Sequence, residues 1–151
     1  MLTATEERDI RVRAGVYDIV MTRAASPAVE ELSERLGFPP AEVRESLERL
    51  ATAKALVLQR DSRDVLMANP FSSVPTPFAV HANGLLYYGN CIWDALGIPA
   101  MLHADARVES SCGCCGEAMD LRVASDTLEP LDGIVHFAIP AHQWWQDIVY
   151  N

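Results

Sequence analysis

Hydrophobic residues in the first third of the chain recur at helical spacing in three short segments. The pattern Thr3-x-x-Glu6 is a capping box that opens the first predicted helix, which extends to about Arg23. Ser26, followed by proline, predicts the start of a second helix that ends at Gly37, and residues 38–50 predict a third helix. The inward positions of the three helices are Val12, Val16, Ile19, Val29, Leu32, Leu36, Val43, Leu47 and Leu50.

Beyond these helices the pattern changes to two apolar runs, residues 55–58 and 65–68, on either side of a polar turn at 60–64. Such a pair predicts a β-hairpin. Three helices followed by a hairpin are typical of a winged helix-turn-helix, so residues 1–68 are predicted to form a winged-helix domain. Residues 69–77 contain three prolines and predict an extended linker.

The second part of the chain predicts a small mixed α/β unit over residues 78–151. A hairpin is expected from strands 78–81 and 85–88 around an Asn-Gly turn. A helix should follow over 91–97, with Pro99 as its stop signal. Further strands are expected at 107–111, 118–123 and 133–139. The predicted fold class is therefore α+β, a winged helix-turn-helix followed by this core.

Half of the 151 residues are hydrophobic, which is enough for a real core. No apolar run reaches the roughly 18 to 20 residues that cross a bilayer, and the N-terminus does not have the pattern of a signal peptide. We therefore expect a cytoplasmic protein without membrane contact.

The net charge of −9 argues against a nucleic-acid binder. Residues 1–68 carry 10 Lys and Arg against 12 Asp and Glu, and residues 69–151 carry 2 against 9. Glu42, Glu45 and Glu48 lie on the third predicted helix, where a winged helix would contact DNA. DNA is thus not expected as a partner, and a packing or dimerisation role for the winged helix, including a homodimer, stays open.

Asn90, Cys91 and Asp94 form the most informative motif. Asn90 is a good N-cap, which would place Cys91 in the first turn of a helix, where free N–H groups favour a thiolate. Asp94 follows at i+3 on the same face, so a soft nucleophile would lie beside a proton donor, in a pocket partly closed by Trp93 or Tyr87. The simpler interpretation is a buried cysteine with a neighbouring acid.

The other three cysteines, Cys112, Cys114 and Cys115, lie in a glycine-punctuated turn between two predicted strands. Such a turn provides half of a zinc-ribbon site. A structural zinc needs a second Cys/His pair, and the spacing of the histidines does not supply one.

The segment Asn90-Cys91-Ile92-Trp93-Asp94-Ala95-Leu96-Gly97-Ile98-Pro99-Ala100, followed by 106–112 and Gly116, resembles the core of the organomercurial (alkylmercury) lyase family. The resemblance implies catalytic roles for Cys91 and Asp94 and a mainly structural role for Cys112. That family also has a winged-helix N-terminal half, so the resemblance covers nearly the whole chain.

The implied reaction is cleavage of a carbon–mercury bond in mercury detoxification. Cys91 would capture mercury and Asp94 would protonate the carbon. The resemblance implies no resident cofactor, because mercury enters with the substrate. Low-molecular-weight thiols or a mercuric reductase are the expected acceptors of Hg(II). Mercury ligands are expected among Cys91, Cys112, Cys114 and Cys115, with Cys114 or Cys115 as a stand-in for a second catalytic thiol.

By the same resemblance, the family's second catalytic cysteine would fall directly after Asn151, so the lyase-like domain is expected to be incomplete in this sequence. A truncated gene, a selenocysteine codon read as a stop, and a shortened relative without activity are three open explanations.

Two alternative functions remain at this stage. The cysteines could bind Hg(II) or another soft metal ion without catalysis. A metal-responsive winged-helix regulator is the other alternative, with the cysteine region as its sensor.

Overall fold

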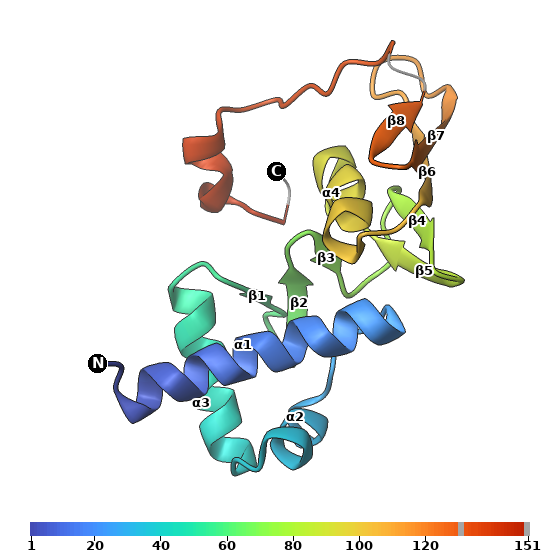
Figure 1. Cartoon of the computed structure of the whole chain (residues 1–151). Coiled ribbons are helices and arrows are strands. Elements are labelled where there is room, and N and C mark those ends of the chain that lie inside the picture. The colour runs from blue at the N-terminus through green and yellow to red at the C-terminus, as the bar shows by residue number, and fades with distance from the viewer. Residues whose placement is uncertain (130–131, 150–151) are drawn as a thin grey trace.

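The chain folds into a helical half and a sheet half, and β3 of the helical half contacts β5 and α4 of the sheet half (Figure 1). The computed structural model describes residues 1–129 and 132–149. The helical half contains α1 (Ala4–Arg23), α2 (Val29–Leu36) and α3 (Pro40–Thr52), followed by an antiparallel sheet of β1 (Val57–Leu58), β2 (Val65–Ala68) and β3 (Phe71–Ser72). The predicted capping box is confirmed, since Thr3 and Glu6 exchange both hydrogen bonds.

The second sheet has five antiparallel strands in the order β5-β4-β6-β7-β8. The strands are β4 (Ala79–Ala82), β5 (Leu85–Tyr88), β6 (Ala106–Ser111), β7 (Ala118–Ala124) and β8 (Thr127–Glu129). Helix α4 (Ile92–Leu102) connects β5 to β6 and packs against β4 and β6. The chain then arches past α4 and forms a short 3₁₀ helix, η1 (Ala141–Gln146) (Figure 1).

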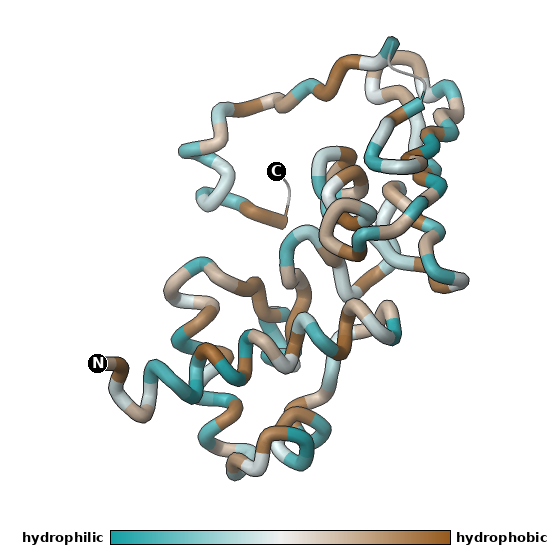
Figure 2. The backbone as a smooth tube through the Cα atoms, in the orientation of Figure 1, coloured by the Kyte–Doolittle hydropathy of each residue, from teal (hydrophilic) through white to brown (hydrophobic). Residues whose placement is uncertain are grey.

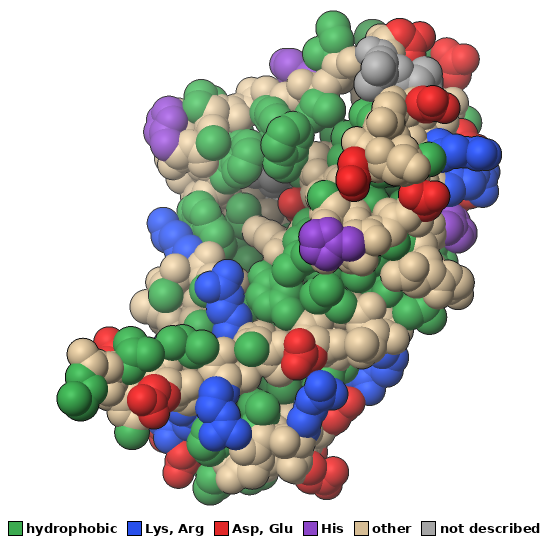
Figure 3. Space-filling view, in the orientation of Figure 1, with side chains coloured by type: hydrophobic (Ala, Val, Ile, Leu, Met, Phe, Trp, Pro, Cys, Tyr) green, Lys and Arg blue, Asp and Glu red, His purple; other side chains and the backbone are tan. Residues whose placement is uncertain are grey.

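One hydrophobic core runs through both halves. Each of α1, α2 and α3 alternates hydrophobic and hydrophilic residues, and the strands of the sheet half mix both kinds (Figure 2). Hydrophobic side chains also gather across the middle of the face in Figure 3, between the helical half below and the sheet half above. Two residues join the halves most directly. Phe71 packs its ring 5.7 Å from that of Tyr87, and the Tyr87 hydroxyl donates to the Met21 carbonyl at 2.7 Å.

The structure differs from the sequence-based elements in four places. α2 begins at Val29 with Ala28 as its N-cap, and the Ser26 hydroxyl pairs with Ser73 instead of capping a helix. Phe71 and Ser72 lie in the segment predicted as a linker but form β3, because Phe71 is only 2 % exposed and its burial fixes the backbone beside β2. The third difference lies after β7, where β8 forms although it was not predicted, while the strand expected at 133–139 does not form among the described residues.

The fourth difference concerns α4, which continues through Pro99 to Leu102 although a stop was predicted there. Proline removes one helical hydrogen bond, that to Ala95, and this normally ends a helix. Ala95, Ile98 and Pro99 are all buried against the sheet, and this burial stabilises the extra turn. Hydrogen bonds from the His103 and Ala104 N–H groups to Ala100 and Pro99 then close its end.

We expect Tyr87→Phe to lower the free energy of unfolding by about 1 kcal/mol, because it removes the hydrogen bond between β5 and α1 and leaves the Met21 carbonyl unpaired. Urea unfolding followed by circular dichroism measures this. Tyr88→Phe is the matched control, since successive strand residues face opposite sides of the sheet. Equal losses in the two variants would contradict a role of the Tyr87 hydroxyl in joining the halves.

Candidate active site at the start of helix α4

Cys91 is the N-cap of α4, one position before the first turn in which it was predicted. Its extended backbone (φ −146°, ψ 179°) turns the chain from β5 into the helix, and Asp94 occupies the third helical position. The side chain of an N-cap residue faces the N–H group of that third position. The structure therefore brings the thiol of Cys91 and the first-turn residue Asp94 to the same helix end, whereas Asn90 lies just outside the helix.

Burial raises the pKa of the half-buried Cys91 thiol. The N–H groups of Asp94 and Trp93 lower it, although no regular capping hydrogen bond forms, and the charge of Asp94 raises it again. The net pKa is above the ordinary value, so the expected preference for a thiolate at this helix start is outweighed by desolvation. The resting thiol is protonated at neutral pH.

Asp94 is also half-buried, and burial raises the pKa of its carboxyl group. Hydrogen bonds from the Asn90 side chain and backbone act in the opposite direction and only partly compensate. The pair thus consists of two acidic groups whose protonated forms are both favoured by the surrounding protein. Such a pair can exchange a proton at little cost when a cation approaches the sulfur.

The Asn90 amide holds the carboxylate in place. Its Nδ2 lies 3.0 Å from Asp94 Oδ2, 3.0 Å from Asn69 Oδ1 and 3.4 Å from the Pro70 carbonyl. The Asn69 carbonyl in turn accepts a hydrogen bond of 2.9 Å from the Tyr17 hydroxyl on α1. Asn90 Oδ1 is buried and has no hydrogen-bond partner among the described residues. Sequence reasoning treated Asn90 only as a helix cap and missed this function.

Gly89 is required by a close approach of two backbone segments. A Cβ atom at this position would lie 2.5 Å from the Ala95 nitrogen and 2.8 Å from its Cα. The strand end can therefore lie directly against the first turn of α4, and this contact sets where Asn90 and Cys91 enter the site. The sequence contains the glycine, but it does not reveal that Gly89 contacts Ala95, six residues later.

Trp93, next to Asp94, is the first of three aromatic rings in contact, and the other two belong to the C-terminal segment. The Trp93 ring is 60 % exposed and lies 6.2 Å from the Phe137 ring, which in turn lies 5.0 Å from that of Trp144. Tyr87, the other residue expected to close a pocket over Cys91, is buried in the core with its hydroxyl bonded to Met21. Of the two residues expected to close the pocket, Trp93 is therefore the exposed one.

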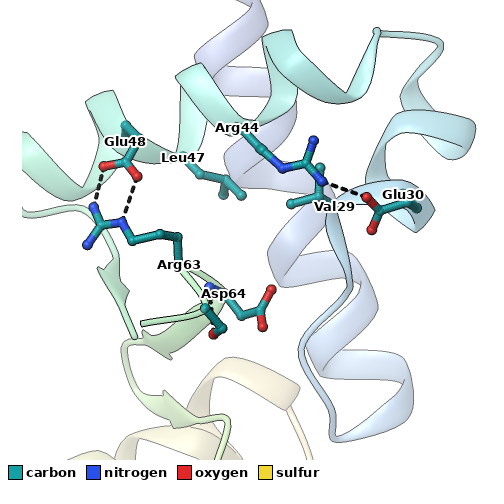
Figure 4. A pocket seen from close by; sticks show the side chains of 8 residues that line it. Val29, Glu30, Arg44, Leu47, Glu48, Arg63 and Asp64 are labelled. Carbon is teal, nitrogen blue, oxygen red and sulfur yellow. Dashed lines mark hydrogen bonds and ion pairs between the residues drawn. The ribbon is translucent and has the colours of Figure 1, made fainter. Parts of the chain in front are cut away.

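A pocket of about 240 Å³ lies in the helical half, between α2, α3 and the β1–β2 turn (Figure 4). Its arginines are already paired, Arg44 with Glu30 at 2.7 Å and Arg63 with Glu48. None of its lining residues belongs to the Cys91 site. The paired charges leave little attraction for an anionic ligand.

The other three cysteines lie together on the turn from β6 to β7, as the sequence predicted for a hairpin. Hydrogen bonds from the Cys115 and Cys114 N–H groups and from the Cys115 thiol lower the pKa of Cys112. Cys114 and Cys115 are exposed. Over residues 1–129 and 132–149, no three His, Cys, Asp or Glu side chains are arranged to hold a metal ion. The mercury ligands expected among the four cysteines stay a prediction.

Comparison with known proteins decides the family. The profile of the MerB alkylmercury lyase family matches residues 71–150, more than half of the chain. The chain belongs to the alkylmercury lyase family. This confirms the resemblance seen in the sequence, and the matched region includes Cys91, Asp94 and the three hairpin cysteines.

Individual alkylmercury lyases match more of the chain. That of Bacillus cereus is 26 % identical over 118 residues, covering 76 % of this chain and 52 % of the relative. That of Streptomyces lividans is 29 % identical over 115 residues, covering 74 % and 51 %. The chain thus spans about half the length of the curated relatives it matches.

A solved structure shows the same fold. The crystal structure of the mercury-bound form of MerB2 superposes with a TM-score of 0.65 at 21 % sequence identity, over 78 % of this chain and 58 % of that one. The alkylmercury lyase fold seen here is a mixed α+β fold with antiparallel sheets. No described helix combines the length and the apolar character needed to cross a membrane.

We expect Gly89→Ala to destabilise the protein by about 1–3 kcal/mol, the usual cost of overpacking, because Ala95 backbone atoms occupy the space of the new methyl group. Thermal unfolding measures the loss. Gly113→Ala is the control, since no atom lies within 4 Å of a Cβ at that position. A variant as stable as the control would contradict the close packing of strand β5 on α4.

We expect Asp94→Asn to become increasingly stabilising, relative to the wild type, as the pH rises above about 4. The folded-state pKa of Asp94 lies above its unfolded value, so ionisation of the unfolded chain pulls the wild type towards unfolding in this range. Below that range Asp94 is protonated in both states, so the pH-dependent part of the difference should vanish. Urea unfolding at pH 3.5, 5 and 7 measures it, with the exposed Asp126→Asn as control. A gain that did not grow with pH would contradict the raised pKa.

Proposed function

We propose that this protein cleaves carbon–mercury bonds in small organomercurials, with Cys91 as the mercury ligand and Asp94 as the proton carrier. The observation that carries the proposal is the placement of a protonated thiol and a half-buried carboxyl group at one helix end. Family membership agrees with this chemistry. The chain spans about half the length of these relatives, so the proposal rests on the residues of this chain.

The first step is capture of mercury. The Cys91 sulfur forms a bond to R–Hg⁺, the thiol proton passes to the Asp94 carboxylate, and the anion or thiol that carried the mercury leaves. Burial raises the thiol pKa because the thiolate loses its hydration. The bond to the cationic metal stabilises the thiolate instead, so the raised pKa does not prevent binding. The Asn90 amide keeps the Asp94 carboxylate at the helix end during this exchange.

The second step is protonolysis. A second thiolate adds to mercury and increases the negative charge on the bonded carbon. The proton on Asp94 then moves to that carbon, the electron pair of the carbon–mercury bond becomes the new C–H bond, and R–H leaves. Hg(II) stays on thiolates, and Asp94 returns to the carboxylate form. No redox change occurs, so no electron donor is needed.

Low-molecular-weight thiols are the proposed source of the second thiolate for this chain and, with a mercuric reductase, the proposed acceptors of Hg(II). The exposed Trp93 ring lies beside the helix start and offers an apolar surface to the organic group of the substrate. No other cofactor is part of this mechanism, because the metal arrives with the substrate.

We further propose that residues 1–68 form a winged helix that packs rather than binds DNA. Three helices followed by short antiparallel strands support the assignment. On α3, Arg44 is paired with Glu30, and Arg49 with Asp9 at 2.8 Å, so its cations are already neutralised by carboxylates. A phosphate backbone would have to displace these pairs.

The full chain, supplied with phenylmercury and millimolar 2-mercaptoethanol, should release benzene. Cys91→Ser should abolish the release, and Asp94→Asn should slow it by about 10²–10⁴-fold, the usual contribution of a positioned acid. Gas chromatography measures benzene, and Asp126→Asn serves as the control. Retained phenylmercury without benzene would favour the alternative function, non-catalytic binding of soft metal ions. Equal rates in wild type and Asp94→Asn would contradict the proton-carrier role.

A further inference from the structure

Two backbone hydrogen bonds hold the turn that carries the three hairpin cysteines at the end of the sheet. Cys112 directly follows β6, and its N–H group donates to the Glu117 carbonyl at 2.8 Å. The Gly116 N–H group donates to the Cys112 carbonyl, also at 2.8 Å. Gly116 has a φ of +73°, a backbone conformation that glycine adopts without strain. The two hydrogen bonds close a loop that carries residues 112 and 115.

Within this loop Cys112 and Cys115 stand at the Cys-x-x-Cys spacing with which one turn supplies two metal-binding sulfurs. The N–H groups of Cys115 and Cys114 and the thiol of Cys115 lower the pKa of Cys112. The closed turn therefore presents the sulfurs of Cys112 and Cys115 as a candidate pair of ligands.

The number of ligands selects the kind of ion. Zinc in structural sites takes four ligands in a tetrahedron. In the described part of the chain, no third His, Cys, Asp or Glu joins this pair in a metal-binding arrangement. Two thiolates alone satisfy a soft cation that accepts linear two-coordinate ligation, and Hg(II) has this preference. The partly exposed position of Cys112 and the exposure of Cys115 leave the pair open to an ion from solvent.

The register of the sheet places this pair at the same end as Cys91. Tyr88 on β5 is paired with Ala79 on β4, and Ala79 is paired with Glu109 on β6. β5 and β6 run in the same direction, so both leave the sheet at this end. Cys91 follows Tyr88 by three residues, and Cys112 follows Glu109 by three residues. Two strand spacings separate the exits, roughly 10 Å.

We propose that Cys112 and Cys115 form a two-thiolate site for Hg(II) and that this site receives the ion released at Cys91. Binding replaces the two thiol protons by two sulfur–mercury bonds, and transfer exchanges one thiolate ligand for another without any redox step. Two thiolates held in one turn compete better than a single thiol, because the second bond forms at a high effective concentration. The receiving role rests on the proposed lyase function, whereas binding of Hg(II) does not.

Binding is tested with inorganic Hg(II) alone, in the Cys91→Ser background, so that lyase activity plays no part. After equilibrium dialysis against excess 2-mercaptoethanol, this chain should retain one Hg(II), and no Zn(II) in a parallel sample. Adding Cys115→Ser or Cys112→Ser should weaken retention at least about 10²-fold. Adding Cys114→Ser, the matched control, should leave it unchanged. Because Cys115 is exposed, its variant should fold normally, which circular dichroism checks.

Full retention in the Cys115→Ser variant, or an equal loss in Cys114→Ser, would overturn the two-thiolate site. Transfer is tested separately with the wild-type chain after benzene release from phenylmercury, by locating mercury on peptides by mass spectrometry. Mercury on the peptide that carries Cys112 and Cys115 is the expected result. Mercury that stays on the Cys91 peptide would overturn the receiving role. Failure to release benzene would contradict the proposed lyase function, while the dialysis result would still decide the two-thiolate site.

Discussion

The hydrogen bonds of one amide, that of Asn90, hold together the parts on which the candidate site depends. Its Nδ2 atom reaches the Asp94 carboxylate, the Asn69 side chain and the Pro70 carbonyl. These groups belong to the first turn of α4 and to the turn between β2 and β3. Through Asn69 the same set of bonds extends to Tyr17 on α1. The orientation of the carboxylate is therefore coupled to the packing of the N-terminal helices, which themselves contribute no acid or thiol to the site.

Burial gives the Cys91 and Asp94 pair its chemical character. A helix start normally favours negative charge, yet both groups have raised pKa values because desolvation outweighs the N–H groups that face them. An anionic sulfur would be reactive towards many electrophiles. A neutral thiol that loses its proton only when a soft cation arrives is more selective, and a neighbouring carboxylate with a raised pKa is a suitable acceptor for that proton.

Much of the fold could be predicted because its signals are local. The Thr3 capping box, the Asn-Gly turn at 83–84 and the alternation of β6 and β7 each depend on residues close together in sequence. The prediction failed where tertiary burial overrides local preference. Pro99 lies inside a helix because its neighbours face the sheet, and Phe71 makes a strand of a proline-rich segment because its ring fills the core.

For the candidate site, the sequence identified Cys91 and Asp94 and the family to which they belong. It could not identify the partners of Asn90, since Asn69 is 21 residues away and no periodic pattern links them. The two hydrogen bonds that close the cysteine turn were likewise hidden, because the spacing of the three cysteines does not say how the backbone between them pairs. The contacts of Asn90 depend on side-chain direction, which hydrophobic patterning does not encode.

The close approach of Gly89 to Ala95 also has a consequence for recognising this arrangement in other genomes. Cys-x-x-Asp is too short a pattern to be diagnostic, and it carries none of the groups that position the acid. A fingerprint that starts two positions earlier, Gly-Asn-Cys-x-x-Asp-Ala, includes the residue that lets the strand touch the helix and the amide that holds the carboxylate. Uncharacterised sequences that satisfy all five fixed positions are the ones in which the same geometry can be built.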